Sequence, residues 1–198
     1  ALKCAHNAIT FTTDSFDNNG DKQAMAATPQ PRNARVFTPA LTPFNADQSV
    51  NVEAFIDFCR WLISQGSGLA VFGTNSEANS LGLEEKILLL EKLVEAGIPA
   101  DQMVPGTGLC ALPETIALTR AAVALGCAGT LTLPPFYFKP ASDDGLFDYY
   151  TRIIEAVGSE RLKLYLYHIP QFTGVPITMT MIERLIKAYP KTVVGIKD

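Results

Sequence analysis

Residues 129–167 read GTLTLPPFYFKPASDDGLFDYYTRIIEAVGSERLKLYLY and carry the clearest pattern of secondary structure in the chain. Short apolar runs at its two ends, 129–133 and 162–167, have the length and composition of buried strands. Between them the apolar residues recur at helical spacing, namely Leu146, Tyr149, Tyr150, Ile153 and Val157. Ser142 stands where a helix N-cap belongs, and Gly158 follows the last periodic residue. The stretch therefore predicts a strand–helix–strand unit.

The same alternation of strand and helix extends from residue 35 to the last residue. The expected strands begin about 30 residues apart and cover 36–41, 68–72, 103–106, 129–133, 162–167 and 193–197. The intervening helices carry matching end signals: Asn51 and Thr178 as N-caps, Pro113 in a first turn, and Gly97 and Gly126 after last turns. Successive units of this kind predict an α/β fold with a parallel sheet.

A closed (β/α)8 barrel, the TIM barrel, is favoured over an open nucleotide-binding sheet, because no glycine-rich dinucleotide fingerprint follows the first expected strand. A complete barrel needs about 250 residues, whereas this sequence has room for about six strands and five helices. We therefore expect residues 33–198 to form the N-terminal part of such a barrel, truncated after strand six. Either the full protein supplies the remaining units, or something else covers the unpaired edge strands, which would otherwise invite aggregation.

Residues 1–32 differ in composition from the rest of the chain. They are rich in Asp, Asn and Pro and show weak periodicity. We expect this segment to be a loosely ordered N-terminal extension, with a weak strand pattern at residues 8–13.

Composition argues against several classes of function. The 198 residues hold 16 Lys and Arg against 20 Asp and Glu, for a net charge of −4, and no basic cluster offers a footprint for nucleic acid. The apolar runs are far shorter than the roughly 20 residues of a bilayer span, and the first residues lack a signal-peptide pattern, so we expect a cytoplasmic protein. Four scattered cysteines and two histidines show no disulfide framework or metal-ligand spacing. We expect reduced thiols, with Cys59 and Cys127 filling space in the core.

Candidate catalytic groups are sought where strands end, because in such barrels the loops after the strands form the working face. Lys197 closes the apolar run 193–196, whereas the other lysines lie in the tail, in loops or on charged helices. Burial of an ammonium group is costly, so we expect its pKa to fall and its neutral amine to act as a nucleophile toward a carbonyl carbon. Two other roles stay open for Lys197, a frayed strand end or an ion pair with Asp198.

Residues at other strand ends complete the candidate site. Tyr167 ends the preceding strand, where its phenol can either reach the amine and move protons or simply pack. Thr74 can orient that phenol, and the 73–76 turn offers backbone N–H groups to a carboxylate. Glu77 is a candidate acid or base, although we expect it to hold the loop by hydrogen bonds. Tyr137, which follows two prolines, is expected in a pocket wall or an interface.

Four strings of these residues share their order and spacing with a known family. They are Gly73-Thr74-Asn75-Ser76-Glu77, the Tyr137 loop, Tyr167-His168-Ile169-Pro170 with Thr173-Gly174, and Gly195-Ile196-Lys197-Asp198. On these strings, residues 35–198 resemble the dihydrodipicolinate synthase/N-acetylneuraminate lyase family. The resemblance implies a (β/α)8 class I aldolase-type enzyme, commonly a homotetramer, that forms a Schiff base with pyruvate or a related 2-oxo acid.

The resemblance also implies a role for each matched residue. Lys197 would be the Schiff-base lysine, Tyr167 the proton shuttle and Thr74 the hydroxyl relay. The Thr74-Asn75 turn would bind the substrate carboxylate, and Tyr137 would be a relay residue that reaches across a subunit interface. No metal or organic cofactor is implied, because the iminium itself serves as the electron sink.

Departures from the family pattern bear on the substrate. Family members usually read Gly-Thr/Ser-Thr-Gly-Glu in the first string, and here Asn75 and Ser76 replace the second hydroxyl residue and the glycine. In carrying Asn75, the sequence resembles the 4-hydroxy-2-oxoglutarate aldolase branch of the family. At the position of Phe172, dihydrodipicolinate synthases carry an arginine that binds the second substrate's carboxylate. The resemblance therefore implies a protein closer to the lyase and sugar-acid aldolase branches than to a true dihydrodipicolinate synthase.

We therefore expect a lyase that acts on pyruvate or a related 2-oxo acid together with an aldehyde or sugar-acid partner. The reaction would be C–C cleavage or condensation, or dehydration of a 2-oxo-3-deoxy sugar acid, through an enamine. Two alternatives stay open: a barrel that binds 2-oxo acids without turnover, and a fragment with neither activity nor a stable fold.

Overall fold

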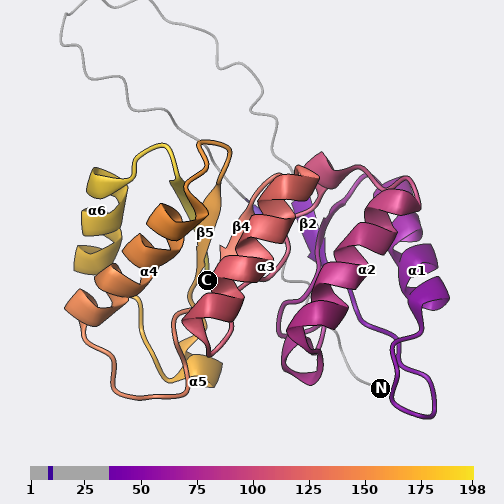
Figure 1. Ribbon diagram of the computed structural model, residues 1–198, viewed down its shortest axis with the longest axis horizontal. Coiled ribbons are helices and arrows are strands. Elements are labelled where there is room, and N and C mark those ends of the chain that lie inside the picture. Colours follow the sequence, from indigo (N-terminus) through magenta and orange to yellow (C-terminus); the bar gives the residue numbers. More distant parts are fainter. Residues whose placement is uncertain (1–8, 11–35) are drawn as a thin grey trace, which may run out of the picture.

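The computed structural model describes residues 9–10 and 36–198, and the rest of the expected N-terminal extension lies outside the described residues. The strands are β1 (Ile9–Thr10), β2 (Val36–Pro39), β3 (Gly68–Ala70), β4 (Thr130–Thr132), β5 (Leu164–Tyr167) and β6 (Val193–Lys197). The helices are α1 (Val52–Ser64), α2 (Leu83–Glu95), α3 (Leu112–Leu125), α4 (Asp143–Val157), α5 (Pro170–Thr173) and α6 (Met179–Ala188), with 3-10 turns η1 (Ala78–Ser80) and η2 (Ala100–Gln102). Strands and helices alternate from β2 to β6 (Figure 1), so the α/β class is confirmed.

The helices begin and end at the signals that the sequence carries. The side chains of Asn51, Ser142 and Thr178 accept hydrogen bonds from first-turn N–H groups of α1, α4 and α6. Gly126 and Gly158 cap α3 and α4 in the left-handed conformation, with φ of 86° and 62°. The short helix α5 was not expected from the sequence, because four residues are too few to show a helical period.

The strands form two three-stranded sheets, ordered β1-β2-β3 and β4-β5-β6. Every pairing from β2 onward is parallel, whereas β1 pairs antiparallel with β2. The strand β1 falls within the weak pattern at residues 8–13. The remaining residues of that pattern are not among those described.

Residues 103–106, predicted as a strand, join the two sheets without forming a regular strand. The N–H groups of Val104 and Gly106 donate to carbonyls of the β3 segment, and the N–H of Leu131 in β4 donates to the carbonyl of Pro105, each at 2.8 Å. Pro105 has no N–H to donate on the side that faces β4, where the pairing is an isolated bridge at Gly106. The pairing with β3 is also an isolated bridge, at Met103. The strand assignment is therefore wrong, although the segment occupies the expected place between β3 and β4.

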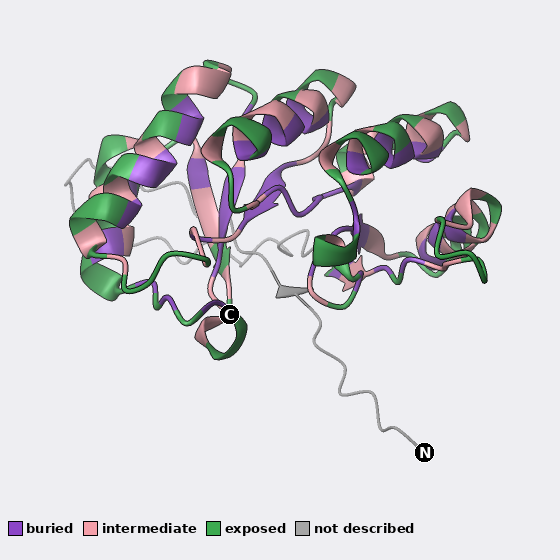
Figure 2. Cartoon of the chain, turned by 60° about the horizontal axis from the view of Figure 1, so that its bottom comes forward, coloured by how far each residue is buried: buried purple, intermediate pink, exposed green. Residues whose placement is uncertain are grey.

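Both faces of the strands are covered by apolar side chains. The long helices lie side by side in chain order along one face (Figure 1), and the helix sides that face the strands are buried (Figure 2). The opposite face carries a layer with members from successive strands: Phe37, Ala70, Val104, Leu131, Tyr165 and Tyr167. Side chains alternate between the two faces of a strand. Leu69 and Leu166 therefore face the helices, whereas the residues next to them in sequence, such as Ala70 and Tyr167, belong to this layer. The layer ends at Tyr167.

Cys59 and Cys127 lie in the apolar core, and the described helices are too short or too polar to span a membrane. Cys59 is fully buried in the core and Cys127 packs against it, and burial raises the pKa of each thiol to about 12. Both fill apolar space, as predicted. Within the described ranges, no helix is long and apolar enough to cross a bilayer.

Candidate active site

The amine of Lys197 and the phenol of Tyr167 meet at the carboxyl ends of neighbouring strands. Lys197 in β6 is the register partner of Tyr167 in β5, so both side chains leave the sheet on the same face. The Lys197 Nζ lies 2.8 Å from the Tyr167 hydroxyl and 4.0 Å from the centre of its ring. Lys197 is half-buried, and the Tyr167 side chain is almost wholly buried. The amine is thus held by a specific partner and is not frayed into solvent.

Thr74 extends this pair into a chain of hydrogen bonds. Its hydroxyl lies 3.0 Å from the Tyr167 hydroxyl. Thr74 follows β3, and residues 103–106 and β4 separate β3 from β5, so a flat sheet would place the two strands about 14 Å apart at about 4.8 Å per spacing. The short contact between the side chains therefore fits a strongly curved sheet whose concave face holds the chain Thr74–Tyr167–Lys197.

A pair of residues outside this chain explains why Asp198 does not neutralise Lys197. The Asp198 carboxylate pairs with the Nδ1 of His168 at 2.9 Å. His168 also donates its backbone N–H to the carbonyl of Lys197 at 2.8 Å. These contacts link the residue after Tyr167 to Lys197 and to the residue that follows it. They replace the ion pair of Lys197 with Asp198 that the sequence left open.

The turn that carries Thr74 is fixed by Ser76. Its buried hydroxyl donates to the carbonyl of Ala40 beyond β2, and its own carbonyl accepts a 2.8 Å hydrogen bond from the Thr42 hydroxyl. Phe72 and Glu77, on either side of the turn, have positive φ values of 60° and 54°, a strained conformation for residues other than glycine. The sequence pattern did not reveal this role of Ser76, because the contact depends on how the ends of β2 and β3 meet in space.

Glu77 does not hold the loop as we expected. It stands at the N-cap of η1 without a capping hydrogen bond from its side chain, and it is exposed. The structural role that we assigned to it belongs to Ser76. The turn also uses the N–H groups of Ser76 and Glu77 in its own hydrogen bonds, to the carbonyls of Gly73 and Thr74. The Ser76 N–H is therefore taken, and Asn75 lies exposed at the tip.

A pocket of about 150 Å³ opens beside Thr74, at the carboxyl ends of β3, β4 and β5. It is mainly apolar, and its lining comes from three loops: Phe72, Gly73, Thr74, Glu77, Ala78, Asn79 and Ser80, then Leu133 and Phe136, then Ile169, Phe172 and Thr173. Phe172 lies in α5 and is 71% exposed. Thr74 and Phe172 were predicted from the sequence as site residues, whereas no sequence pattern indicated Phe136.

Tyr137 does not line this pocket. Its side chain is 72% exposed and stacks edge-on against Phe138, with the ring centres 5.0 Å apart. Of the two places expected for Tyr137, a wall of this pocket is not observed, and an interface stays a prediction. No group of three or more His, Cys, Asp and Glu residues within 36–198 has an arrangement that could hold a metal ion.

Comparison with known proteins identifies relatives of this sequence and fold. Residues 32–198 match the model of the dihydrodipicolinate synthetase family. An uncharacterized DapA-like lyase of Chloroflexus aurantiacus is 37% identical over 165 residues, which cover 82% of this chain and 54% of the relative. The chain spans about half the length of the curated relatives it matches.

Solved structures give the same result. A dihydrodipicolinate synthase from Agrobacterium tumefaciens superposes with a TM-score of 0.77 at 32% identity, over 81% of this chain and 57% of that one. A prophage protein of the dihydrodipicolinic acid synthase family from E. coli, in complex with pyruvate, superposes with a TM-score of 0.72 at 28% identity, over 81% of this chain and 52% of that one.

Proposed function

Because the chain belongs to the dihydrodipicolinate synthetase family, we propose that the protein is a class I lyase that forms a Schiff base between Lys197 and pyruvate or a related 2-oxo acid. The observation that carries the proposal is the hydrogen-bonded chain of Lys197, Tyr167 and Thr74. A site with a lysine amine within hydrogen-bond distance of a buried phenol contains both a nucleophile and a group that can move protons.

In the proposed mechanism each member of the chain has one task. The Lys197 amine adds to the C2 carbonyl of the 2-oxo acid, and water leaves to give an iminium. Tyr167, 2.8 Å from the amine, carries protons to and from the carbinolamine oxygen, and Thr74 orients the phenol from 3.0 Å. Loss of a C3 proton gives the enamine, which forms a C–C bond with an aldehyde or arises when such a bond breaks. The iminium is the electron sink, so no other cofactor takes part.

The turn after β3 is the proposed site for the carboxylate of the 2-oxo acid. Thr74 and Asn75 lie at its tip, and their backbone N–H groups would serve as donors to the two oxygens. The anchoring of this turn by Ser76 supports the assignment, because a donor pair binds an anion best when it is already in position. Asn75 supplies an exposed amide in place of the hydroxyl that relatives usually carry.

The remaining parts of the proposal concern the whole protein. Eight strands would close the sheet into a barrel, and the full chain would form a homotetramer or dimer in which Tyr137 acts as a relay residue at a subunit interface. The exposure of Tyr137 supports this, since a large aromatic side chain that is 72% exposed has surface available for a neighbouring subunit. Phe172, where an arginine would be needed to bind a second carboxylate, supports a reaction other than dihydrodipicolinate synthesis.

Turnover by the full-length protein tests this function. We expect release of pyruvate from a 4-hydroxy-2-oxo acid, or dehydration of a 2-oxo-3-deoxy sugar acid, and loss of either activity in Lys197→Ala. Condensation of pyruvate with aspartate semialdehyde should be poor. Comparable turnover of aspartate semialdehyde and the best compound would overturn the assignment against dihydrodipicolinate synthesis. A pyruvate imine without turnover of any compound would favour the alternative of a 2-oxo-acid-binding barrel.

A further inference from the structure

The pocket beside Thr74 is connected to Lys197 by hydrogen bonds, although neither Lys197 nor Tyr167 is among its lining residues. Thr74 both lines the pocket and bonds to Tyr167, whose hydroxyl contacts the Lys197 amine. Two hydrogen bonds thus separate the pocket wall from the nucleophile. The side chain of a partner aldehyde would occupy this space while its carbonyl carbon faced the enamine.

The polar groups in the pocket are few, and two of them are already used. The Thr173 hydroxyl donates to the carbonyls of Ile169 and Val175 and accepts a hydrogen bond from the Val175 N–H. The Thr74 hydroxyl is engaged with Tyr167. Glu77, Asn79 and Ser80 remain, all exposed and all from the loop after β3. A polyhydroxylated chain would therefore find donors and acceptors on one rim only.

The described lining offers no cation to a second carboxylate. Glu77 is its only charged side chain and would repel a carboxylate on the partner substrate, whereas the carboxylate of the 2-oxo acid is proposed to bind the backbone N–H groups of Thr74 and Asn75. Lys139 lies nearby but does not line the pocket. It packs on Gly174, where an added Cβ would meet its Cδ at 2.9 Å and its Nζ at 3.2 Å.

The remaining walls of the pocket are aromatic and aliphatic. Phe136 comes from the loop after β4, and Ile169 and Phe172 come from the segment after β5, so two loops place rings on the same space. The volume, about 150 Å³, is that of a cavity that accommodates one benzene ring. Phe172 is the most exposed of these wall residues, and contact with a ligand ring would bury it.

We propose that the partner substrate is an uncharged aldehyde with a single aromatic or similarly compact apolar group, which Phe136, Ile169 and Phe172 bind. This inference rests on the proposed function. In condensation, C3 of the Lys197-bound enamine forms a bond to the aldehyde carbon, and the aldehyde oxygen takes a proton to become a hydroxyl. Water then hydrolyses the iminium, releases a 4-hydroxy-2-oxo acid and restores the amine. Cleavage runs the same steps in reverse.

The test measures kcat/KM of the full-length protein for pyruvate with three aldehydes: benzaldehyde, glyceraldehyde and succinic semialdehyde. We expect benzaldehyde to exceed the other two by about tenfold or more, since apolar contacts of this size discriminate by 10- to 200-fold. Phe172→Ser should lower the benzaldehyde value by about tenfold and narrow the preference. Met179→Ser is the matched control, because Met179 is 70% exposed at the start of α6 and lies outside the pocket lining. Its preference should equal that of the wild type.

Three results would overturn the inference. Glyceraldehyde as the best partner would show that the polar rim reads hydroxyl groups. Succinic semialdehyde as the best partner, with loss of that preference in Lys139→Gln, would show that Lys139 binds a carboxylate. An unchanged preference among the aldehydes in Phe172→Ser would show that the Phe172 ring does not contribute to substrate recognition. A separate arm, borohydride reduction with pyruvate alone, reports on the proposed function. Protein that is labelled with pyruvate but does not use benzaldehyde would refute only this inference. Protein that is not labelled with pyruvate would refute the proposed function.

Discussion

At the scale of single residues, the pairing of Lys197 with Tyr167 follows from backbone register. The two residues are cross-strand partners at the ends of β5 and β6, and their hydrogen bond is 2.8 Å long. The contact between His168 and Asp198 joins the next residues of the same two strands. The amine and the phenol are therefore held by rigid elements, which is the arrangement that a positioned proton transfer needs.

Removal of the Tyr167 hydroxyl tests whether the phenol moves protons or only packs. Tyr167→Phe keeps the ring in the apolar layer, so we expect the melting temperature to change little and kcat to fall by about 10²- to 10⁴-fold, the usual contribution of a positioned acid–base group. Tyr189→Phe, which removes a surface hydroxyl bonded to Glu155, is the control and should keep full activity. An unchanged kcat in Tyr167→Phe would mean that the phenol serves packing alone.

Ser76 gives a prediction about stability. Its hydroxyl is the partner of the buried Ala40 carbonyl, so Ser76→Ala would leave that carbonyl without a donor. We expect the free energy of unfolding to fall by about 1–3 kcal/mol, the usual cost of an unsatisfied buried polar group. Ser80→Ala removes an exposed hydroxyl from the same loop and should change the free energy by less than about 0.5 kcal/mol. Urea denaturation measures both, and equal stability of the two variants would contradict the anchoring role.

The residues that sequence reasoning found and missed differ in a physical way. Lys197 and Tyr167 could be predicted because an apolar strand that ends in a polar residue points to a barrel mouth. Ser76 and Phe136 could not, because their roles depend on which loop ends meet in three dimensions. The Glu77 prediction failed for a related reason: the positive φ at Glu77 is a property of the folded turn, and no local pattern announces it.

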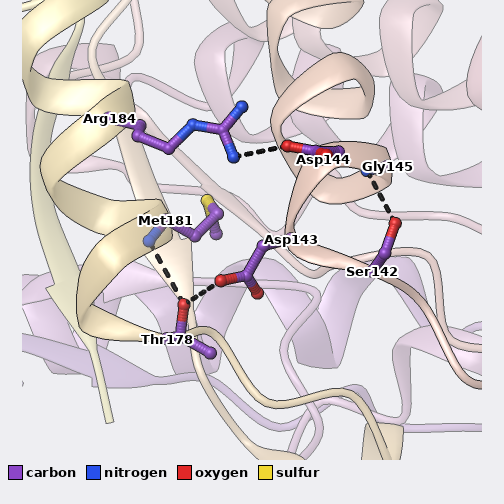
Figure 3. Close-up of polar contacts among 7 residues, drawn as sticks. All are labelled: Ser142, Asp143, Asp144, Gly145, Thr178, Met181 and Arg184. Atoms are coloured by element: carbon purple, nitrogen blue, oxygen red, sulfur yellow. Dashed lines mark hydrogen bonds and ion pairs between the residues drawn. The ribbon is translucent and has the colours of Figure 1, made fainter.

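At the scale of elements, the helices α4 and α6 are joined at their first turns (Figure 3). The Thr178 hydroxyl accepts a hydrogen bond from the Met181 N–H, capping α6, and donates to the Asp143 carboxylate of α4 at 2.5 Å. Arg184 pairs with Asp144 at 2.7 Å and lies 4.6 Å from the ring centre of Phe147. The loops that precede these helices carry Phe136 and Phe172, so the contact joins the far ends of the two loops that contribute aromatic side chains to the pocket.

The cap of α6 can be tested by two substitutions at one position. Thr178→Ala removes both hydrogen bonds, and we expect it to lower the free energy of unfolding by about 1 kcal/mol, within the 0.5–2 kcal/mol range of N-cap substitutions. Thr178→Ser keeps the hydroxyl and should retain most of the stability. Thermal unfolding followed by circular dichroism compares them, and an equal loss in both variants would show that the methyl group, and not the cap, matters.

The sequence predicts these elements unevenly, and the causes are local. Long amphipathic helices with Asn51, Ser142 and Thr178 at their starts are specified by periodicity and capping together. Residues 103–106 look like a strand because they are apolar, yet they form only isolated bridges, and Pro105 removes a donor on the side that faces β4. Hydrophobic periodicity indicates which residues are buried, whereas a regular ladder of hydrogen bonds between strands also needs the backbone N–H of every bonded residue.

At the scale of the whole molecule, a buried charge on α2 opposes folding. Lys86 is 1% exposed, and burial lowers its pKa from 10.5, an effect that Glu114 and Glu85 partly oppose. The unfolded chain therefore binds the Lys86 proton more tightly than the folded protein does. The unfavourable contribution is largest at neutral and acidic pH and disappears as the pH rises through the lowered pKa toward 10.5.

This linkage predicts the sign of a pH-dependent effect. Lys86→Met keeps the volume and removes the charge, so it should be more stable than the wild type at pH 7, and the difference should shrink by pH 10. Urea denaturation of the full-length protein at both pH values measures the difference. A variant that is less stable than the wild type at pH 7 would show that the ammonium contributes more through its contacts than its burial costs.

Borohydride trapping of the imine shows whether Lys197 is the nucleophile. The full-length protein is treated with pyruvate and borohydride, digested and mapped by mass spectrometry. We predict a reduced pyruvyl adduct on the peptide that contains Lys197 and on no other, and no adduct in Lys197→Ala. An adduct on a different lysine, or none on correctly folded protein, would contradict the account.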